Sequence, residues 1–223
     1  MLRDKRIRII TGHYGSGKTE FSVNYAIKLA ESGRKTAIAD LDIVNPYFRS
    51  REKKAQMERL GIRVVAPEGQ FINADVPALS PVIYTLLQDE SYEAVLDVGG
   101  DTVGARVLGR YFEYLKHGGY DMFIVVNANR PNTGSPGAVA RYIEGIERSA
   151  RVPATGLVNN THMLRDTTVE DVLRGQKVVE EVSRMKDLPV KYISAVERVA
   201  KELPEGLTGR IFPVKMYMRP EWL

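Results

Sequence analysis

The residues best suited to chemistry lie near the N-terminus, where positions 12–19 have the sequence GHYGSGKT. This segment fits the pattern G-x-x-x-x-G-K-[ST], in which glycines let the backbone curl around phosphate groups and successive N–H groups donate hydrogen bonds to them. Lys18 would place a positive charge beside the β- and γ-phosphates of a nucleotide, and the hydroxyl of Thr19 would bind Mg²⁺. The predicted nucleotide-binding residues are Gly12, His13, Tyr14, Gly15, Ser16, Gly17, Lys18, Thr19 and Glu20.

Carboxylates follow two other apolar runs of the chain. Asp40 and Asp42 are separated by one residue, so the alternation of side chains along an extended strand places both on one face. They suit a Mg²⁺-linked or water-orienting role, and the alternative is a pair of solvated aspartates at a strand end. The run that ends at Asp97 precedes a Gly-Gly turn and predicts a carboxylate for Mg²⁺, with an ordinary strand-terminal cap as the alternative. Asp101 is either a second metal ligand or a helix cap.

The elements that would position these residues follow from the hydrophobic pattern. Short β-branched runs alternate with longer segments of helical periodicity, which is typical of a parallel sheet covered by helices. A helix is predicted at residues 18–31, and the spacing of Thr167 and Glu170 predicts the capping box of a later one. Loops at residues 99–104 and 129–137 follow strand ends, the side of such a sheet where ligands bind. Strands are predicted at residues 7–11, 36–40, 63–66, 94–97, 122–127, 155–159 and 190–194, with an edge strand at 211–217.

Composition limits the classes of function. A length of 223 residues suits one α/β domain over residues 1–223. The chain has no cysteine, which excludes disulfides, thiolate metal sites and cysteine nucleophiles and fits a cytoplasmic protein. No apolar run approaches the roughly 20 residues of a membrane-spanning helix. The net charge of +4 is too small to favour nucleic-acid binding.

Taken together, the phosphate loop, the Asp40-x-Asp42 segment and Asp97 with its Gly-Gly turn resemble the MinD/ParA/Mrp group of SIMIBI-class P-loop ATPases, over residues 6–203. Residues 40–46 look like the switch I of that group. The resemblance implies a three-layer, doubly wound and mostly parallel sheet of seven or eight strands with helices on both faces. It also implies ATP/ADP binding with Mg²⁺, slow ATP hydrolysis coupled to a conformational switch for an unknown protein partner, and often a homodimer.

The resemblance also suggests roles for single residues. Asp42 would orient the attacking water beside the catalytic Lys18, and Asp40 and Asp97 would lie near Mg²⁺. Asn159 falls where the group has an asparagine that contacts adenine, and a carboxamide offers both the donor and the acceptor that the N6 and N7 edge needs. Asn160 is the alternative if the register differs by one, and a turn residue at the end of a strand is the alternative role for Asn159.

His13 departs from the pattern of the group, much of which has a lysine there that reaches the phosphates of a dimer partner. A histidine with an ordinary pKa of about 6.5 is mostly neutral at pH 7 and supplies no permanent cation. We therefore expect a slow ATPase that needs a partner to supply the cation. The competing expectation is that His13, held protonated by the triphosphate, replaces the lysine within a homodimer.

Three other functions remain open from the sequence. A metallochaperone-type P-loop GTPase is disfavoured because the chain has no Asn-Lys pair for guanine, no cysteine and only three histidines. A small-molecule kinase or ligase could use Arg106, Arg110 and Arg130 to bind an acidic acceptor, although arginines in such helices and loops are typically surface charges. A non-catalytic nucleotide-binding adaptor could dock residues 215–223 on a partner, whereas the same tail could pack on the core or the sheet edge.

Overall fold

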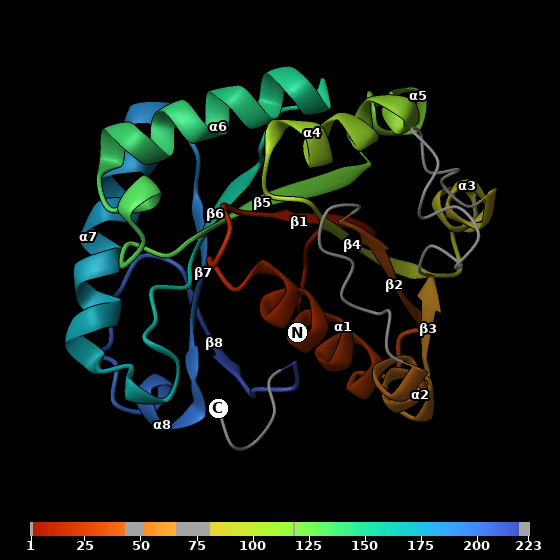
Figure 1. Ribbon diagram of the computed structural model, residues 1–223. Coiled ribbons are helices and arrows are strands. Elements are labelled where there is room, and N and C mark those ends of the chain that lie inside the picture. Colours follow the sequence, from red (N-terminus) through yellow and green to blue (C-terminus); the bar gives the residue numbers. More distant parts are fainter. Residues whose placement is uncertain (1, 43–50, 66–80, 118, 219–223) are drawn as a thin grey trace.

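The computed structural model describes residues 2–42, 51–65, 81–117 and 119–218 of the chain. Its eight strands form one sheet in which every neighbouring pair is parallel (Figure 1). The strands are β1 (Ile7–Thr11), β2 (Thr36–Leu41), β3 (Ile62–Val65), β4 (Glu93–Val98), β5 (Tyr120–Val126), β6 (Gly156–Asn159), β7 (Val190–Val196) and β8 (Arg210–Val214). Their order across the sheet is β3-β2-β4-β1-β5-β6-β7-β8, which confirms the predicted doubly wound parallel sheet.

Helices cover both faces of this sheet, so the fold has three layers. In Figure 1, α4, α5 and α6 lie over one face, and α1 and α2 lie over the other. The helices are α1 (Lys18–Glu31), α2 (Arg51–Arg59), α3 (Pro81–Gln88), α4 (Thr102–Ala105), α5 (Phe112–Leu115), α6 (Pro136–Ala150), α7 (Val169–Lys186) and α8 (Glu197–Ala200), with 3₁₀ turns η1 (Arg106–Tyr111), η2 (Pro131–Thr133) and η3 (Leu164–Asp166). None of the helices within these described segments is long and apolar enough to cross a membrane.

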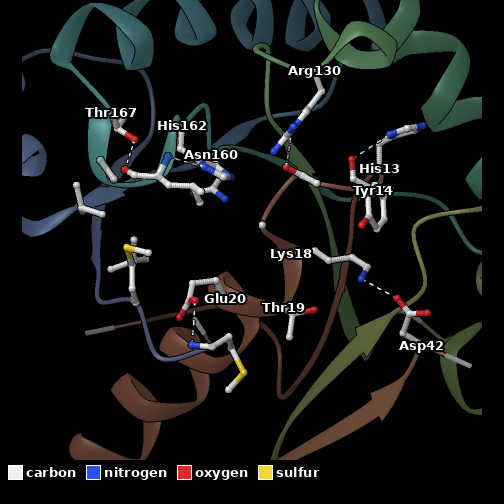
Figure 2. A pocket seen from close by; sticks show the side chains of 18 residues that line it. His13, Tyr14, Lys18, Thr19, Glu20, Asp42, Arg130, Asn160, His162 and Thr167 are labelled. Atoms are coloured by element: carbon white, nitrogen blue, oxygen red, sulfur yellow. Dashed lines mark hydrogen bonds and ion pairs between the residues drawn. The ribbon is translucent and has the colours of Figure 1, made fainter. Parts of the chain in front are cut away.

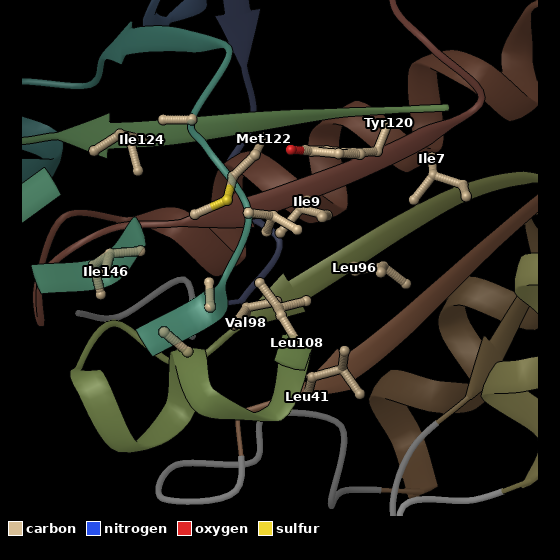
Figure 3. Close-up of a cluster of buried hydrophobic side chains, with 14 of the residues drawn as sticks. Ile7, Ile9, Leu41, Leu96, Val98, Leu108, Tyr120, Met122, Ile124 and Ile146 are labelled. Carbon is tan, nitrogen blue, oxygen red and sulfur yellow. The ribbon is translucent and has the colours of Figure 1, made fainter. Parts of the chain in front are cut away.

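The alternation of side chains along β1 explains the two hydrophobic layers. Ile7 and Ile9 join the cluster beneath α3, α4, α6 and α7 (Figure 3), whereas Ile10 packs with Phe21 of α1 on the opposite face. Ile9 and Ile10 are fully buried, and burying such a side chain contributes about 1.5–3 kcal/mol. Because β1 is buried on both faces, its C-terminal end is a rigid support for the loop that follows.

Most predicted strands begin or end within two residues of the observed ones, and two other predicted boundaries differ for a clear reason. Thr168, and not Thr167, caps α7, because the hydroxyl of Thr167 contacts the Leu164 carbonyl and the Met163 amide, whereas Thr168 and Asp171 form the capping box. The edge strand β8 ends at Val214 rather than at residue 217, because the next residues bind α1 in place of a neighbouring strand. Residues 43–46 of the predicted switch I, residue 66 of the third predicted strand, and residues 219–223 of the tail lie outside the described residues.

Candidate functional site

The phosphate loop occupies residues 12–17, between the end of β1 and the start of α1, as the sequence predicts. Gly15 and Gly17 have φ angles of +76° and +80°, a left-handed conformation that glycine adopts without strain. At Gly12, a side chain would clash with the Val125 carbonyl of β5. The amide of Ser16 donates to the His13 carbonyl at 2.9 Å and closes the turn. The loop therefore needs its glycines both for its turns and for its close packing against the sheet.

Lys18 and Thr19, at the start of α1, contact carboxylates from two different strands. The Lys18 Nζ atom lies 2.7 Å from an oxygen of Asp42, just beyond β2 (Figure 2). The Thr19 hydroxyl donates to Asp97 of β4 at 2.6 Å. Ser22, one turn further along α1, lies 3.1 Å from the other oxygen of Asp97. The three sequence motifs, which are far apart along the chain, thus meet at one edge of the sheet.

Asp40 lies opposite Asp97 in the parallel pairing of β2 with β4, and both carboxylates are buried. One oxygen of Asp40 accepts a hydrogen bond from the Asp42 amide at 3.0 Å. The carboxylate of Asp40 also helps to raise the pKa of Lys18, after those of Asp97 and Asp42. Asp40 therefore adds negative charge and fixes the backbone of the segment that carries Asp42.

Electrostatic interactions at this edge are strong because water is largely excluded. Burial alone would lower the pKa of Lys18, but the carboxylates of Asp97 and Asp42 outweigh it, and the pKa of Lys18 is raised. Burial raises the pKa of Asp97 against the opposing effects of Lys18 and of the hydroxyl donors. Several buried carboxylates beside a phosphate loop suit a site that receives a metal cation together with its anionic ligand.

The Gly-Gly turn after β4 packs directly on the phosphate loop. A side chain at Gly100 would clash with the Gly12 carbonyl, and the Gly100 carbonyl accepts a hydrogen bond from Tyr142 of α6 at 3.1 Å. Thr11 donates to the carbonyl of Gly99 at 3.2 Å. Asp101 caps α4 by accepting from the Gly104 amide at 2.6 Å, which supports the second of the two roles predicted for it. A conformational change in the phosphate loop would therefore also displace this turn and α6.

A cavity of about 400 Å³ opens beside the phosphate loop, and its two ends differ in character (Figure 2). One end is polar, with Lys18, Thr19, Asp42 and the loop glycines. The other end, which we call the apolar end, is lined by Leu164, Ala195, Val196, Val214, Met216 and Met218, together with the polar side chains of Glu20, Asn160, His162 and Thr167. A volume of this size suits a small-molecule ligand such as a nucleotide. The polar end would hold an anionic group and the apolar end a flat ring.

The structure places Asn160 rather than Asn159 in this cavity. Asn159 is fully buried, its amide nitrogen donates to the Val172 carbonyl at 3.0 Å and to Gln176 at 3.1 Å, and its oxygen accepts from the Thr161 amide. Asn160 lines the cavity and donates to the Ser16 carbonyl at 2.7 Å. Asn159 thus joins β6 to α7 through its hydrogen bonds. Asn160, the alternative considered if the register differed by one, is the residue that lines the cavity.

Glu20 also has a role that differs from the predicted one. Its carboxylate lines the cavity but accepts hydrogen bonds from the main-chain amides of Tyr217 at 2.7 Å and Met218 at 3.1 Å. Because these bonds direct the carboxylate toward the C-terminal segment, Glu20 tethers that segment to α1. No pattern in the sequence predicts this contact, because the residues are almost 200 positions apart.

His13 and Arg130 lie on the loop side of the cavity. The Nδ1 atom of His13 lies 3.3 Å from the Tyr14 carbonyl, which only accepts, and its Nε2 atom lies 3.2 Å from the donating amide of Asn132. Arg130 lines the cavity and donates to the Gly15 carbonyl at 3.2 Å. Of the three arginines that the sequence suggested for binding an acidic acceptor, Arg130 is therefore the one at the cavity. Tyr14, in the same loop, is exposed.

Comparisons with known proteins support the fold. No family model matches the sequence. Over 78 residues, which are 35% of this chain and 22% of the relative, the sequence is 35% identical to the iron-sulfur cluster carrier protein of Saccharolobus solfataricus. Among solved structures, the cell division protein FtsY of Thermotoga maritima has a TM-score of 0.58 and 20% identity, covering 86% of this chain and 62% of that chain.

A second FtsY structure, the signal recognition particle receptor of Elizabethkingia anophelis in complex with GDP, gives a similar result. Its TM-score is 0.54 at 20% identity, with 87% of this chain and 58% of that chain covered. The chain thus spans about a fifth of the curated relative and about three fifths of the FtsY chains. These similarities show that the chain has the three-layer α/β fold of P-loop NTPases.

Proposed function

We propose that this chain binds Mg-ATP in the cavity, hydrolyses it slowly, and acts as a nucleotide-dependent switch for a protein partner. The observation that carries the proposal is the convergence of a phosphate loop, Lys18 and Asp42 at the polar end of a cavity of nucleotide size. The buried Asp97, which accepts from Thr19, and Asp40, opposite it on β2, add two further carboxylates. A structural loop would not need a charged lysine held among buried carboxylates, because burying unneeded charge costs free energy.

Each polar residue then has a chemical role. The loop amides and Lys18 would hold the β- and γ-phosphates and neutralise the charge that develops as the terminal phosphate leaves. Asp42 would orient the attacking water and accept its proton once the phosphates compete for Lys18. Gly100, in contact with the phosphate loop, would let the backbone approach the terminal phosphate. Little covalent chemistry is required of the protein, so positioning and charge supply most of the catalysis.

The donor set fits a magnesium ion that arrives with the nucleotide. The Thr19 hydroxyl and the Asp97 carboxylate are hard oxygen donors that already lie together, with Asp40 nearby, and Mg²⁺ takes one or two such protein groups and otherwise phosphate oxygens and water. Within the described segments, no group of three or more His, Asp or Glu side chains is arranged to hold a metal alone. When bound, Mg²⁺ would screen the charge of the phosphates.

The apolar end of the cavity would take the base, and we propose adenine. The sequence contains no Asn-Lys pair of the kind that recognises guanine, and Asn160 offers a carboxamide at the cavity wall. GTP is the second candidate, because a structure of the same fold, the FtsY of Elizabethkingia anophelis, is a complex with GDP. The binding experiment below therefore compares ATP with GTP.

The partner would respond to the segment that follows Asp42. Lys18 would link the phosphates to Asp42, which lies within the predicted switch I at residues 40–46, so the presence of a terminal phosphate would be transmitted to that segment. The partner is either another protein or a second copy of this chain. His13 contacts Tyr14 and Asn132 of its own chain, and in this proposal the partner supplies the cation.

Isothermal titration calorimetry with Mg-ATP and Mg-GTP tests the proposal. Lys18→Ala should weaken ATP binding by about 100-fold or more, because the phosphates lose a charged hydrogen-bonding partner in a site that excludes water. Lys116→Ala, which removes a surface lysine from α5's C-terminal end, is the matched control and should bind normally. Unchanged affinity of Lys18→Ala would mean that the loop is not the binding site, and equal competition by GTP would reject the choice of adenine.

A further inference from the structure

Three polar side chains form a stripe along α1. Glu20, Asn24 and Lys28 are spaced four residues apart, so they lie on one face of the helix. Asn24 is almost fully buried, and the charged head of Lys28 lies over the ring of Phe212 at 3.7 Å. Buried polar groups need hydrogen-bond partners, and all three side chains find them in the main chain of residues 213–218.

The three contacts follow one another in order along both segments. Lys28 donates to the Pro213 carbonyl at 2.5 Å. Asn24 pairs with the main chain of Lys215 in both directions, donating to its carbonyl and accepting from its amide, each at 2.8 Å. Glu20 forms the third contact, with the amides of residues 217 and 218. We call this set of contacts the α1 ladder.

The repeat distances of a helix and of an extended chain explain why the ladder fits. Four residues of a helix advance about 6.0 Å, and two residues of a strand advance about 6.6 Å. Side chains at positions 20, 24 and 28 can therefore bind alternate residues of a strand that runs in the opposite direction. The last contact is made by Glu20, which directly follows Thr19, so the ladder brings the chain back to the phosphate loop.

The side chains of this segment extend from the same backbone that binds α1. Alternate side chains of an extended chain point to the same side, and Val214, Met216 and Met218 all line the apolar end of the cavity, while the main chain of residues 213, 215, 217 and 218 binds α1. Thioether side chains are polarizable and pack well on flat aromatic rings. The segment therefore forms a wall against which a base would lie.

We infer that residues 213–218 are the base-binding wall of the nucleotide site and that the α1 ladder positions them. The inference rests on the proposed function, which it deepens. Glu20 is then a positioning residue and not a ligand of the phosphates, because its carboxylate would repel them while it binds two main-chain amides. The ladder makes one helix responsible for both halves of the nucleotide, with its N-terminus at the phosphates and its polar stripe behind the base.

The test separates binding of the base from binding of the phosphates. Mg-ATP and Mg-tripolyphosphate are titrated into the wild-type protein, Asn24→Ala and Met216→Ala. Both variants should bind ATP about 10-fold or more weakly, because the wall is displaced or shortened, but should bind tripolyphosphate within about 2-fold of the wild-type affinity. Glu31→Ala, at the exposed end of the same helix, is the control and should leave both affinities unchanged.

Methyl NMR of the methionines gives an independent readout. The signals of Met216 and Met218 should shift with ATP, through the ring current of the base, and not with tripolyphosphate. Equal losses for ATP and tripolyphosphate, unchanged ATP affinity, or methyl shifts that are the same with both ligands would each overturn the inference. If thermal unfolding shows that Asn24→Ala does not fold, Met216→Ala decides, because it leaves the ladder intact.

Different results would reject the proposed function itself. A wild-type protein that binds neither ligand, or a Lys18→Ala variant that binds ATP normally, would reject the nucleotide site itself and this inference with it. Binding of both ligands that depends on Lys18 but is indifferent to the wall would leave the nucleotide site standing and overturn only the role of residues 213–218.

Discussion

Replacing Asp42 with asparagine tests how the site engages a nucleotide, because Lys18 cannot bind Asp42 and a phosphate equally well at once. The two side chains are 14% and 5% exposed, so water screens their 2.7 Å contact only weakly. A hydrogen bond to a charged group contributes about 1.5–3 kcal/mol net, and a bound phosphate must compete with it. The ion pair therefore opposes nucleotide binding and holds Asp42 away from its proposed role until the phosphates arrive.

Asp42→Asn keeps the shape of the side chain and removes its charge. Allowing for the weaker hydrogen bond that asparagine retains, we expect Mg-ATP to bind more tightly by about 1–2 kcal/mol, which is about 5- to 30-fold. The rate of hydrolysis should fall by about 100-fold or more, because asparagine cannot accept a proton from water. Tighter ATP binding together with slower hydrolysis distinguishes this role from a loss of fold, which would weaken binding as well as slow hydrolysis.

The assay combines calorimetry with single-turnover hydrolysis at one ionic strength, because charge effects depend on salt. Glu144→Gln, which removes one exposed negative charge from α6, controls for the general attraction of a less negative protein to an anion. An Asp42→Asn variant with unchanged or weaker ATP affinity would refute the competition for Lys18. Hydrolysis at the wild-type rate would refute the role of Asp42 in catalysis.

Three further predictions concern other parts of the structure. Gly100→Ala should reduce ATP affinity more than 10-fold in calorimetry, because the new methyl group clashes with the Gly12 carbonyl, and normal binding would contradict that packing. Thr168→Ala should lower the free energy of unfolding in urea by about 1 kcal/mol through loss of the α7 cap, whereas an effect confined to Thr167→Ala would restore the predicted cap. His13→Lys should make the rate per subunit rise with protein concentration while the wild-type rate stays flat, and a wild-type rate that rises at pH 6 would favour a protonated histidine.

The phosphate loop and its neighbours could be predicted from the sequence because local rules determine them. The bounds of β1 and α1 agree with the prediction, since the loop pattern fixes where one ends and the other begins. The position of Asp42 and Asp97 near the phosphate loop follows from parallel strands whose ends meet at one edge of the sheet, whereas the ion pair of Lys18 with Asp42 was not predicted. Each of these inferences needs only a motif, the side-chain period of a strand and the topology that the alternation of elements implies.

Other features depend on packing that no local pattern encodes. Thr167 and Thr168 are equally good caps by type, and the choice is made by the Leu164 carbonyl, which occupies the hydroxyl of Thr167. Asn159 and Asn160 are likewise adjacent residues of one type. The docking of α7 on β6 takes the side chain of Asn159 into the interior, where it binds Gln176, and leaves Asn160 at the cavity. An error of one residue in the predicted register thus changes which asparagine lines the cavity.

The α1 ladder shows why the base end was the hardest part to predict. In the sequence, Glu20, Asn24 and Lys28 have the spacing of an ordinary solvated helix face, and residues 213–218 resemble an edge strand or a docking tail. Only the position of β8 at the edge of the sheet, beside α1, turns two unremarkable patterns into one set of hydrogen bonds. Because Glu20 and Thr19 are consecutive on a rigid helix, displacement of the phosphate end must also move the wall behind the base, so both halves of a nucleotide would report on the position of α1.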